Sequence, residues 1–208
     1  MHRSTKLPSF GVYAITDGPR KNLVEDVELA LAGGVAVVQY RDKTTDRARR
    51  RAEAGALLAT CRRHGVPLII NDDVDLAMEI RADGVHLGED DMLPAKARSK
   101  LGNDAIIGVS CYNSLERARE FATRGVDYLA LGSFFESPTK PNARRATIEL
   151  LTAVAALHLP IVVIGGITPD NAQPMLDAGA DFVAIVSGLF ATSDVKQTAQ
   201  RYAALFST

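Results

Sequence analysis

The sequence has almost no net charge and few cysteines, and each shortage excludes a class of protein. Its 24 Lys and Arg residues nearly balance its 25 Asp and Glu residues, for a formal net charge of -1. No overall positive field therefore favours nucleic acid or an anionic membrane as a partner. The two cysteines, Cys61 and Cys111, are too few for a disulfide framework and favour a reducing compartment.

The sequence also lacks a long apolar run. The nearest approach, residues 29–38, contains Gly33 and Gly34 and has about half of the ~20 residues that a membrane span needs. The N-terminal stretch MHRSTKLPSF has no apolar region of the kind that secretory signals carry. We therefore expect a cytoplasmic protein without a membrane partner, whose partners are small-molecule substrates. Self-association is left open.

Short apolar runs alternate with amphipathic stretches along the chain. Eight runs read as buried strands, at residues 11–16, 35–40, 66–71, 83–88, 105–110, 127–132, 160–166 and 181–188. Helical patterns separate them, so the order predicts right-handed βαβ units and a parallel sheet. Eight such units predict closure into a (β/α)8 TIM barrel, in the α/β class. A doubly wound open sheet is the rival, but no GxGxxG fingerprint follows the first strand.

The length of 208 residues predicts one domain over residues 1–208. Residues 1–9 are expected to form an N-terminal extension, and residues 191–208 the last barrel helix. Asp46 and Ser114 precede helical patterns and are predicted to cap those helices.

Polar residues gather where the predicted strands end, which is the end of a TIM barrel that carries active sites. In the segment VQYRDK, residues 38–43, a buried strand runs into Gln39, Arg41 and Lys43. Residues two apart on an extended chain point the same way. One amide and two cations are therefore directed at one spot, which predicts an anion-binding site.

Acidic residues follow the next two strands. Asp72 and Asp73 come after the first of these strands, and Glu89, Asp90 and Asp91 after the second. Either set has an ordinary explanation, as helix caps or as a solvated loop. Beside Arg and Lys side chains, however, carboxylates suit Mg²⁺, which takes one or two carboxylates together with substrate phosphate oxygens. The pattern therefore predicts a magnesium diphosphate site.

Glycine and serine follow the last two strands, at Gly165-Gly166 and Ser187-Gly188. A glycine pair is a weak motif by itself. Its position after these strands is the place where many TIM barrels hold a phosphate with backbone N–H groups. We expect a second anion site there.

Protein nucleophiles are not evident in the sequence. His86 lies inside an apolar strand pattern and is interpreted more readily as a packed histidine than as a base. Cys111 has no activating base nearby in the sequence and is interpreted as structural. Neither a Ser-His-Asp arrangement nor a metal-ligand spacing of histidines is present.

These segments resemble the thiamine-phosphate synthase family. The resemblance covers roughly residues 11–190 and rests on long motifs in the family's order: VQYRDK, LIINDDVDLA, ADGVHLGEDDM, IIGVSCYNS, GVDYLALGSFFESPTKP, IVVIGGITPDN and AGADFVAIVSG. It implies a Mg²⁺-dependent transferase that joins hydroxymethylpyrimidine diphosphate to a thiazole monophosphate, giving thiamine phosphate and diphosphate. The implied reaction is dissociative, so it needs little help from a base.

The resemblance also implies roles for matching positions. Asp72 and Asp91 are implied to bind Mg²⁺. The implied contacts of the pyrimidine diphosphate are Gln39, Arg41, Lys43, Asn71, Ser110 and Lys140. The implied lining of the thiazole-phosphate site is Ser137, Pro138, Thr139, Gly166, Val186 and Ser187. The residues expected to act in catalysis are Arg41, Lys43, Ser110 and Lys140. Ser137 departs from the family, which more often has threonine there, but it keeps the hydroxyl.

Two alternatives remain. A thiazole tautomerase, a paralogue of the same fold, would need a base, which we associate with a histidine at the position of Tyr112. A non-catalytic phosphate-binding barrel would have no reason to hold magnesium ligands and cations together. Whether Arg144 or Arg145 reaches the site is left open.

Overall fold

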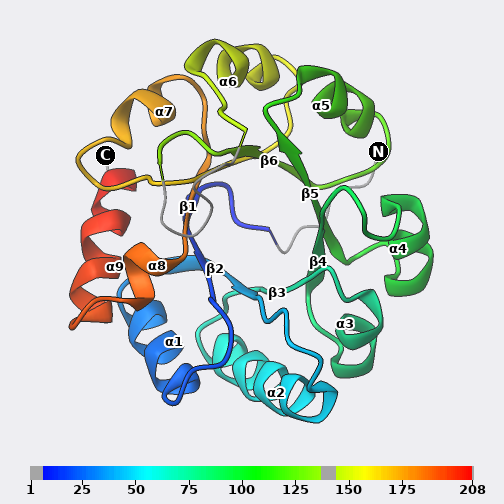
Figure 1. The fold of residues 1–208 in the computed structure, drawn as a ribbon, viewed down its shortest axis with the longest axis vertical. Helices are drawn as coiled ribbons and strands as arrows, with labels where there is room; N and C mark the ends of the chain where they lie inside the picture. Colours follow the sequence, from blue (N-terminus) through cyan, green and yellow to red (C-terminus); the bar gives the residue numbers. More distant parts are fainter. Residues whose placement is uncertain (1–6, 137–143, 208) are drawn as a thin grey trace.

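The protein is a closed barrel of parallel strands, ringed by helices (Figure 1). The computed structural model describes residues 7–136 and 144–207. Each strand pairs with its neighbours in sequence, and the eighth pairs with the first. The strands are β1 (Gly11–Ile15), β2 (Val35–Tyr40), β3 (Leu68–Asn71), β4 (Gly84–Leu87), β5 (Ile106–Tyr112), β6 (Tyr128–Gly132), β7 (Ile161–Ile164) and β8 (Phe182–Ile185). The predicted (β/α)8 architecture is confirmed.

The helices lie on the outside of the barrel. Those of the described residues are α1 (Leu23–Ala32), α2 (Arg47–Arg63), α3 (Val74–Ile80), α4 (Pro94–Leu101), α5 (Leu115–Ala122), α6 (Ile148–Ala155), α7 (Gln173–Asp177), α8 (Ser187–Phe190) and α9 (Val195–Ala203), followed by a 3₁₀ turn (Ala204–Phe206). The short helix α8 was not predicted, because four residues are too few to show a helical period in the sequence. None of the helices described is long and apolar enough to cross a membrane.

Side-chain caps begin several of these helices. The Asp46 carboxylate accepts a hydrogen bond from the Arg49 N–H at 3.0 Å, and the Ser114 hydroxyl accepts one from the Arg117 N–H at 3.1 Å. Both predicted caps are therefore confirmed. Asp73 caps α3 in the same way. Of the two acidic residues after β3, Asp73 is thus the cap, and Asp72 needs another explanation.

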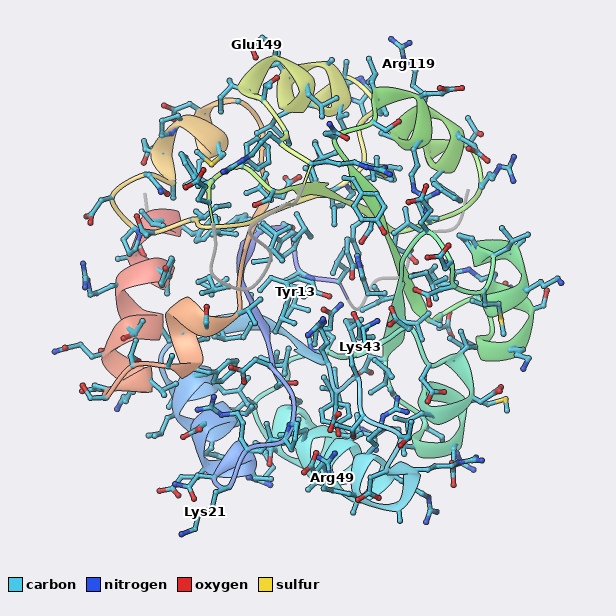
Figure 2. The ribbon with its side chains drawn as sticks, in the orientation of Figure 1. Tyr13, Lys21, Lys43, Arg49, Arg119 and Glu149 are labelled. Atoms are coloured by element: carbon cyan, nitrogen blue, oxygen red, sulfur yellow. The ribbon has the colours of Figure 1, made fainter. Side chains whose placement is uncertain are left out.

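Alternation along the strands divides the apolar core into two layers. In β1, Val12 and Ala14 belong to the layer between the barrel and its helices, whereas Tyr13 and Ile15 belong to the layer inside the barrel. Figure 2 shows Tyr13 inside the ring of strands. The inner layer also contains Tyr128, so two tyrosine hydroxyl groups lie inside a barrel that is otherwise filled largely by aliphatic side chains.

Candidate active site

A cavity of about 690 Å³ lies at the carboxyl ends of the strands. This is where sequence reasoning expected the site. The predicted site residues that line it are Gln39, Arg41, Asn71, Ser110, Gly166, Val186 and Ser187. Lys43, Asp72 and Asp91 form a group beside it. Asp72 and Asp91 directly follow the cavity residues Asn71 and Asp90 in the sequence. The predicted residues Ser137, Pro138, Thr139 and Lys140 lie outside the described residues.

The segment after β2 alternates as predicted. Gln39 and Arg41 line the cavity, and Lys43 also points toward the middle of the barrel (Figure 2). Asp42, between them, points the other way and pairs with the Arg49 guanidinium of α2 at 2.7 Å. One set of alternate residues therefore faces the site, while Asp42 fastens the segment to a helix.

Asp42 is held as a carboxylate. Burial opposes its charge, but the hydrogen bond from the Thr44 N–H, at 2.8 Å, and the Arg49 guanidinium outweigh that effect. The pKa of Asp42 is therefore lowered from its ordinary value. The ion pair stabilises the conformation that presents Arg41 to the cavity.

Two carboxyl groups from neighbouring loops meet beside the cavity. Asp72 has a backbone φ of 63°, which is uncommon for a residue other than glycine. Its carboxylate pairs with Lys43 and also lies within hydrogen-bonding reach of the Asp91 carboxyl. Burial, together with Asp72, raises the pKa of Asp91. The Gly88 N–H donates to Asp91 at 2.6 Å and fixes its position.

The carboxyl groups of Asp72 and Asp91 fit one kind of metal ion. In the described part of the chain, no group of three or more His, Cys, Asp and Glu side chains is arranged to hold a metal. A site made wholly of protein ligands is therefore not present there. The paired oxygens of Asp72 and Asp91 fit Mg²⁺, which commonly takes one or two carboxylates and completes its coordination with phosphate oxygens and water.

A chain of hydrogen bonds crosses the barrel beneath the cavity. The Gln39 amide nitrogen lies 3.4 Å from the Tyr13 hydroxyl, which lies 2.7 Å from the Tyr128 hydroxyl. The Tyr128 hydroxyl lies 2.9 Å from His86 Nδ1, and His86 Nε2 lies 2.9 Å from the Ser110 hydroxyl. The chain thus joins two predicted substrate contacts through three side chains that had no assigned role.

Burial keeps the members of this hydrogen-bond chain uncharged. It lowers the pKa of His86 to about 4 and raises the pKa of Tyr13 and of Tyr128. His86 also stacks on Tyr128, with 5.6 Å between ring centroids. Its interpretation as a packed histidine is consistent with these contacts. Tyr13 and Tyr128 were missed, although a tyrosine inside an otherwise aliphatic strand pattern was a readable signal.

The glycines after β7 bring the backbone close to the loop after β6. Gly166 has a φ of 64°, and a Cβ atom there would lie 2.7 Å from the Phe135 Cβ. A side chain is therefore excluded on two grounds. After the neighbouring strand β8, helix α8 begins at Ser187, and the first N–H groups of a helix have no carbonyl partner within it. These two segments line the part of the cavity where a second anion site was expected.

Arg144 lines the cavity directly, whereas Arg145 contacts it through Glu136. The Arg144 guanidinium lies 5.9 Å from the ring centroid of Tyr112 and 3.9 Å from the Glu89 carboxylate, and all three residues line the cavity. Arg145 pairs with Glu136, which also lines the cavity, at 3.0 Å. The question that the sequence left open is therefore answered for the cavity as described.

Comparison with known proteins agrees with this geometry. A family model described as "Thiamine monophosphate synthase" matches residues 12–189. The chain belongs to the thiamine monophosphate synthase family. It is accordingly an enzyme, a transferase of thiamine biosynthesis with thiamine-phosphate synthase activity. Small-molecule substrates follow from that activity.

Relatives of this family match the chain over nearly its full length. It is 54% identical over 200 residues to "Thiamine-phosphate synthase" of Thiobacillus denitrificans, which covers 94% of each chain. It is 49% identical over 208 residues to the protein of the same name from Methylobacillus flagellatus, covering 99% of this chain and 100% of that one. The solved structure of thiamine phosphate pyrophosphorylase from Pyrococcus furiosus superposes with a TM-score of 0.87 at 33% identity, covering 97% of this chain and 96% of that one.

Proposed function

We propose that the chain joins an aminopyrimidine diphosphate, 4-amino-2-methyl-5-hydroxymethylpyrimidine diphosphate, to 4-methyl-5-(2-phosphoethyl)thiazole with the help of Mg²⁺. The observation that carries this proposal is the meeting of Lys43, Asp72 and Asp91 beside a cavity that Arg41 lines. Cations and paired carboxylates at one place suit a magnesium diphosphate better than a lone phosphate or a neutral ligand.

The diphosphate contacts the cationic side of the cavity. Arg41 forms no ion pair with any residue in the described part of the chain, so its guanidinium is available to the substrate. Lys43 pairs with Asp72 and lies where it can exchange that partner for a phosphate oxygen. When bound by Asp72 and Asp91, Mg²⁺ supplies further neutralisation of the leaving group.

The reaction begins when the bond between the pyrimidine methylene and the diphosphate oxygen breaks. The electron pair leaves with the diphosphate, whose charge Arg41 and Lys43 stabilise, together with Lys140 by family resemblance. The electron-rich aminopyrimidine stabilises the methylene cation. The lone pair of the thiazole nitrogen then forms the new C–N bond, and no proton has to be removed from it. Such a reaction needs no protein nucleophile.

The remaining contacts hold the two rings together. Gln39, Asn71 and Ser110 lie where they can bind the pyrimidine, and Gly166, Val186 and Ser187 where they can bind the thiazole phosphate. The cavity of about 690 Å³ is large enough for both substrates at once. Holding the nucleophile beside the cation is the main contribution that the protein can make to such a reaction. Ser137, Pro138 and Thr139 remain proposed thiazole contacts on the resemblance alone.

The alternatives are less well supported. A tautomerase needs a base, but position 112 is a tyrosine whose hydroxyl accepts a hydrogen bond from the Glu89 N–H at 3.2 Å. His86 is half-buried and bonded at both ring nitrogens, with its pKa lowered to about 4. A non-catalytic phosphate-binding barrel does not account for the paired carboxylates of Asp72 and Asp91. A reducing, cytoplasmic location is kept as a proposal, supported by the free, buried thiols of Cys61 and Cys111.

The test is a direct assay with purified protein. Both substrates and Mg²⁺ are expected to give thiamine phosphate and one equivalent of diphosphate, with neither product when EDTA replaces the metal. Each substrate is also supplied alone as a control. Folded protein that gives no thiamine phosphate with both substrates and Mg²⁺ would contradict the proposed reaction, and turnover in EDTA would contradict the metal requirement.

A further inference from the structure

We infer that Tyr13, Tyr128 and His86 are positioning residues, which force Gln39 and Ser110 to present opposite hydrogen-bonding groups to the pyrimidine. The inference rests on the proposed function, because it explains how an aminopyrimidine is recognised. It adds a role for two buried tyrosines and a half-buried histidine that do not take part in the bond-breaking step.

The geometry of the hydrogen-bond chain carries this inference. Its members come from five strands: Gln39 from β2, Tyr13 from β1, Tyr128 from β6, His86 from β4 and Ser110 from β5. All five line the cavity. Figure 2 shows Tyr13 inside the barrel, between the strands that the chain connects. The two end residues keep a hydrogen-bonding group that can face the cavity, whereas each phenol oxygen keeps only a second lone pair.

Counting hydrogens shows why the two ends are linked. Four contacts join the five residues, and each contact needs one hydrogen. The two phenols and the neutral imidazole supply one hydrogen each, which makes three. The fourth hydrogen must come from one end of the chain, either from the Gln39 amide or from the Ser110 hydroxyl.

Each choice gives the cavity a different pair of groups. If the Gln39 NH₂ donates to Tyr13, the hydrogens run toward Ser110, whose own O–H is then free to donate while the Gln39 oxygen is free to accept. If Ser110 donates to His86, the order reverses: the Gln39 amide is turned over so that its oxygen accepts from Tyr13. The free groups then become an NH₂ donor at Gln39 and an oxygen acceptor at Ser110. In both orders the cavity offers one donor and one acceptor.

This pairing matches the chemistry of an aminopyrimidine. Its exocyclic amine donates a hydrogen bond, and its ring nitrogens accept one. A linked donor and acceptor therefore suit it, and a buried group left without its partner would cost binding energy. Without the chain, the Ser110 hydroxyl and the Gln39 amide could rotate independently into combinations that do not match the ring.

The first test compares phenylalanine variants by steady-state kinetics. Tyr13→Phe and Tyr128→Phe keep the packed rings and break the hydrogen-bond chain. We expect each to raise the KM for the aminopyrimidine diphosphate about five- to tenfold, which is the effect of one hydrogen bond. The KM for the thiazole phosphate is expected to stay unchanged.

The matched control is Tyr40→Phe. Tyr40 is as buried as Tyr13 and donates to the Glu53 carboxylate at 2.7 Å, outside the hydrogen-bond chain. It is expected to leave both KM values unchanged. Wild-type values in Tyr13→Phe and Tyr128→Phe would overturn the inference, and so would an equal rise of both KM values in each variant.

A second test needs no turnover and separates this inference from the proposed function. The protein has four histidines, so the ¹⁵N signals of His86 are assigned by their loss in His86→Gln. They report which ring nitrogen carries the hydrogen. We expect the proportions of the two neutral tautomers in Tyr13→Phe to differ from those of the wild type, because the imidazole is no longer linked to Gln39.

The tautomer measurement does not depend on whether the protein is active. Equal tautomer proportions in the wild type and in Tyr13→Phe would overturn the inference, as would a change that Tyr40→Phe shares. If the wild-type protein forms no thiamine phosphate but the tautomers respond as expected, the proposed reaction fails and the hydrogen-bond chain stands.

Discussion

The ring of Tyr128 occupies the space that a side chain at Gly108 would fill, because a Cβ atom at Gly108 would overlap the ring at Cζ. Gly108 and Tyr128 are paired in register between β5 and β6. The glycine therefore lets the phenol cross the barrel interior and reach both Tyr13 and His86. A residue without a side chain thus determines where a buried hydroxyl lies.

Replacing this glycine should displace the tyrosine. We expect Gly108→Ala to lower the free energy of unfolding by about 1–3 kcal/mol, as overpacked cores do, and to weaken binding of the pyrimidine. Urea unfolding measures the first effect. The control is Gly55→Ala in α2, where a Cβ atom would meet nothing within 4 Å. That variant should be stabilised by about 0.5–1 kcal/mol. Unchanged stability in Gly108→Ala would contradict the overlap.

Substitutions of Asp72 and Asp91 are expected to affect activity and stability differently. Asp72→Asn and Asp91→Asn should each lower Mg²⁺-dependent turnover by more than about 100-fold, because a ligand of the ion is lost. Asp91→Asn should not lower the melting temperature, because burial and Asp72 already oppose its charge. The control is Asp75→Asn on α3, an exposed carboxylate paired with Lys100 at 2.7 Å. Near-normal turnover of either site variant would remove that residue from the proposed metal site.

The fold could be predicted because its signals are local. Apolar runs of strand length and the alternation of Gln39, Arg41 and Lys43 are readable within a few residues. The choice between Asp72 and Asp73 was not, since it depends on a left-handed backbone at Asp72 and on the loop after the neighbouring strand β4.

The hydrogen-bond chain could not be predicted from the sequence. Tyr13 and Tyr128 are 115 residues apart, and their contact depends on the register of the closed barrel. Each tyrosine alone looks like an ordinary core residue. Only the assembled interior shows that both hydroxyl groups meet and that they connect Gln39 to Ser110.

The pair formed by Asp42 and Arg49 should make stability depend on pH. Because the pKa of Asp42 is lower in the folded protein than in the unfolded chain, its contribution is present above an unfolded pKa of about 3.9. It is lost as the pH falls through the lower, folded value. We expect Asp42→Asn to be destabilised by about 1–3 kcal/mol at pH 7. The difference from the wild type should shrink below about pH 4. A constant difference from pH 7 to pH 3, measured by urea unfolding, would contradict this account.

Arg41 should affect diphosphate binding without affecting stability. It has no ion-pair partner in the described part of the chain, so Arg41→Gln leaves no carboxylate there without its partner. We expect the melting temperature to stay the same and the affinity for inorganic diphosphate with Mg²⁺ to fall about 10- to 100-fold, the effect of hydrogen bonds to a charged group. Isothermal titration calorimetry measures the affinity. Arg47→Gln is the control, because Arg47 is 80% exposed on α2 and lies 3.5 Å from Glu79, outside the cavity. Equal affinities in the wild type and Arg41→Gln would remove Arg41 from the proposed diphosphate site.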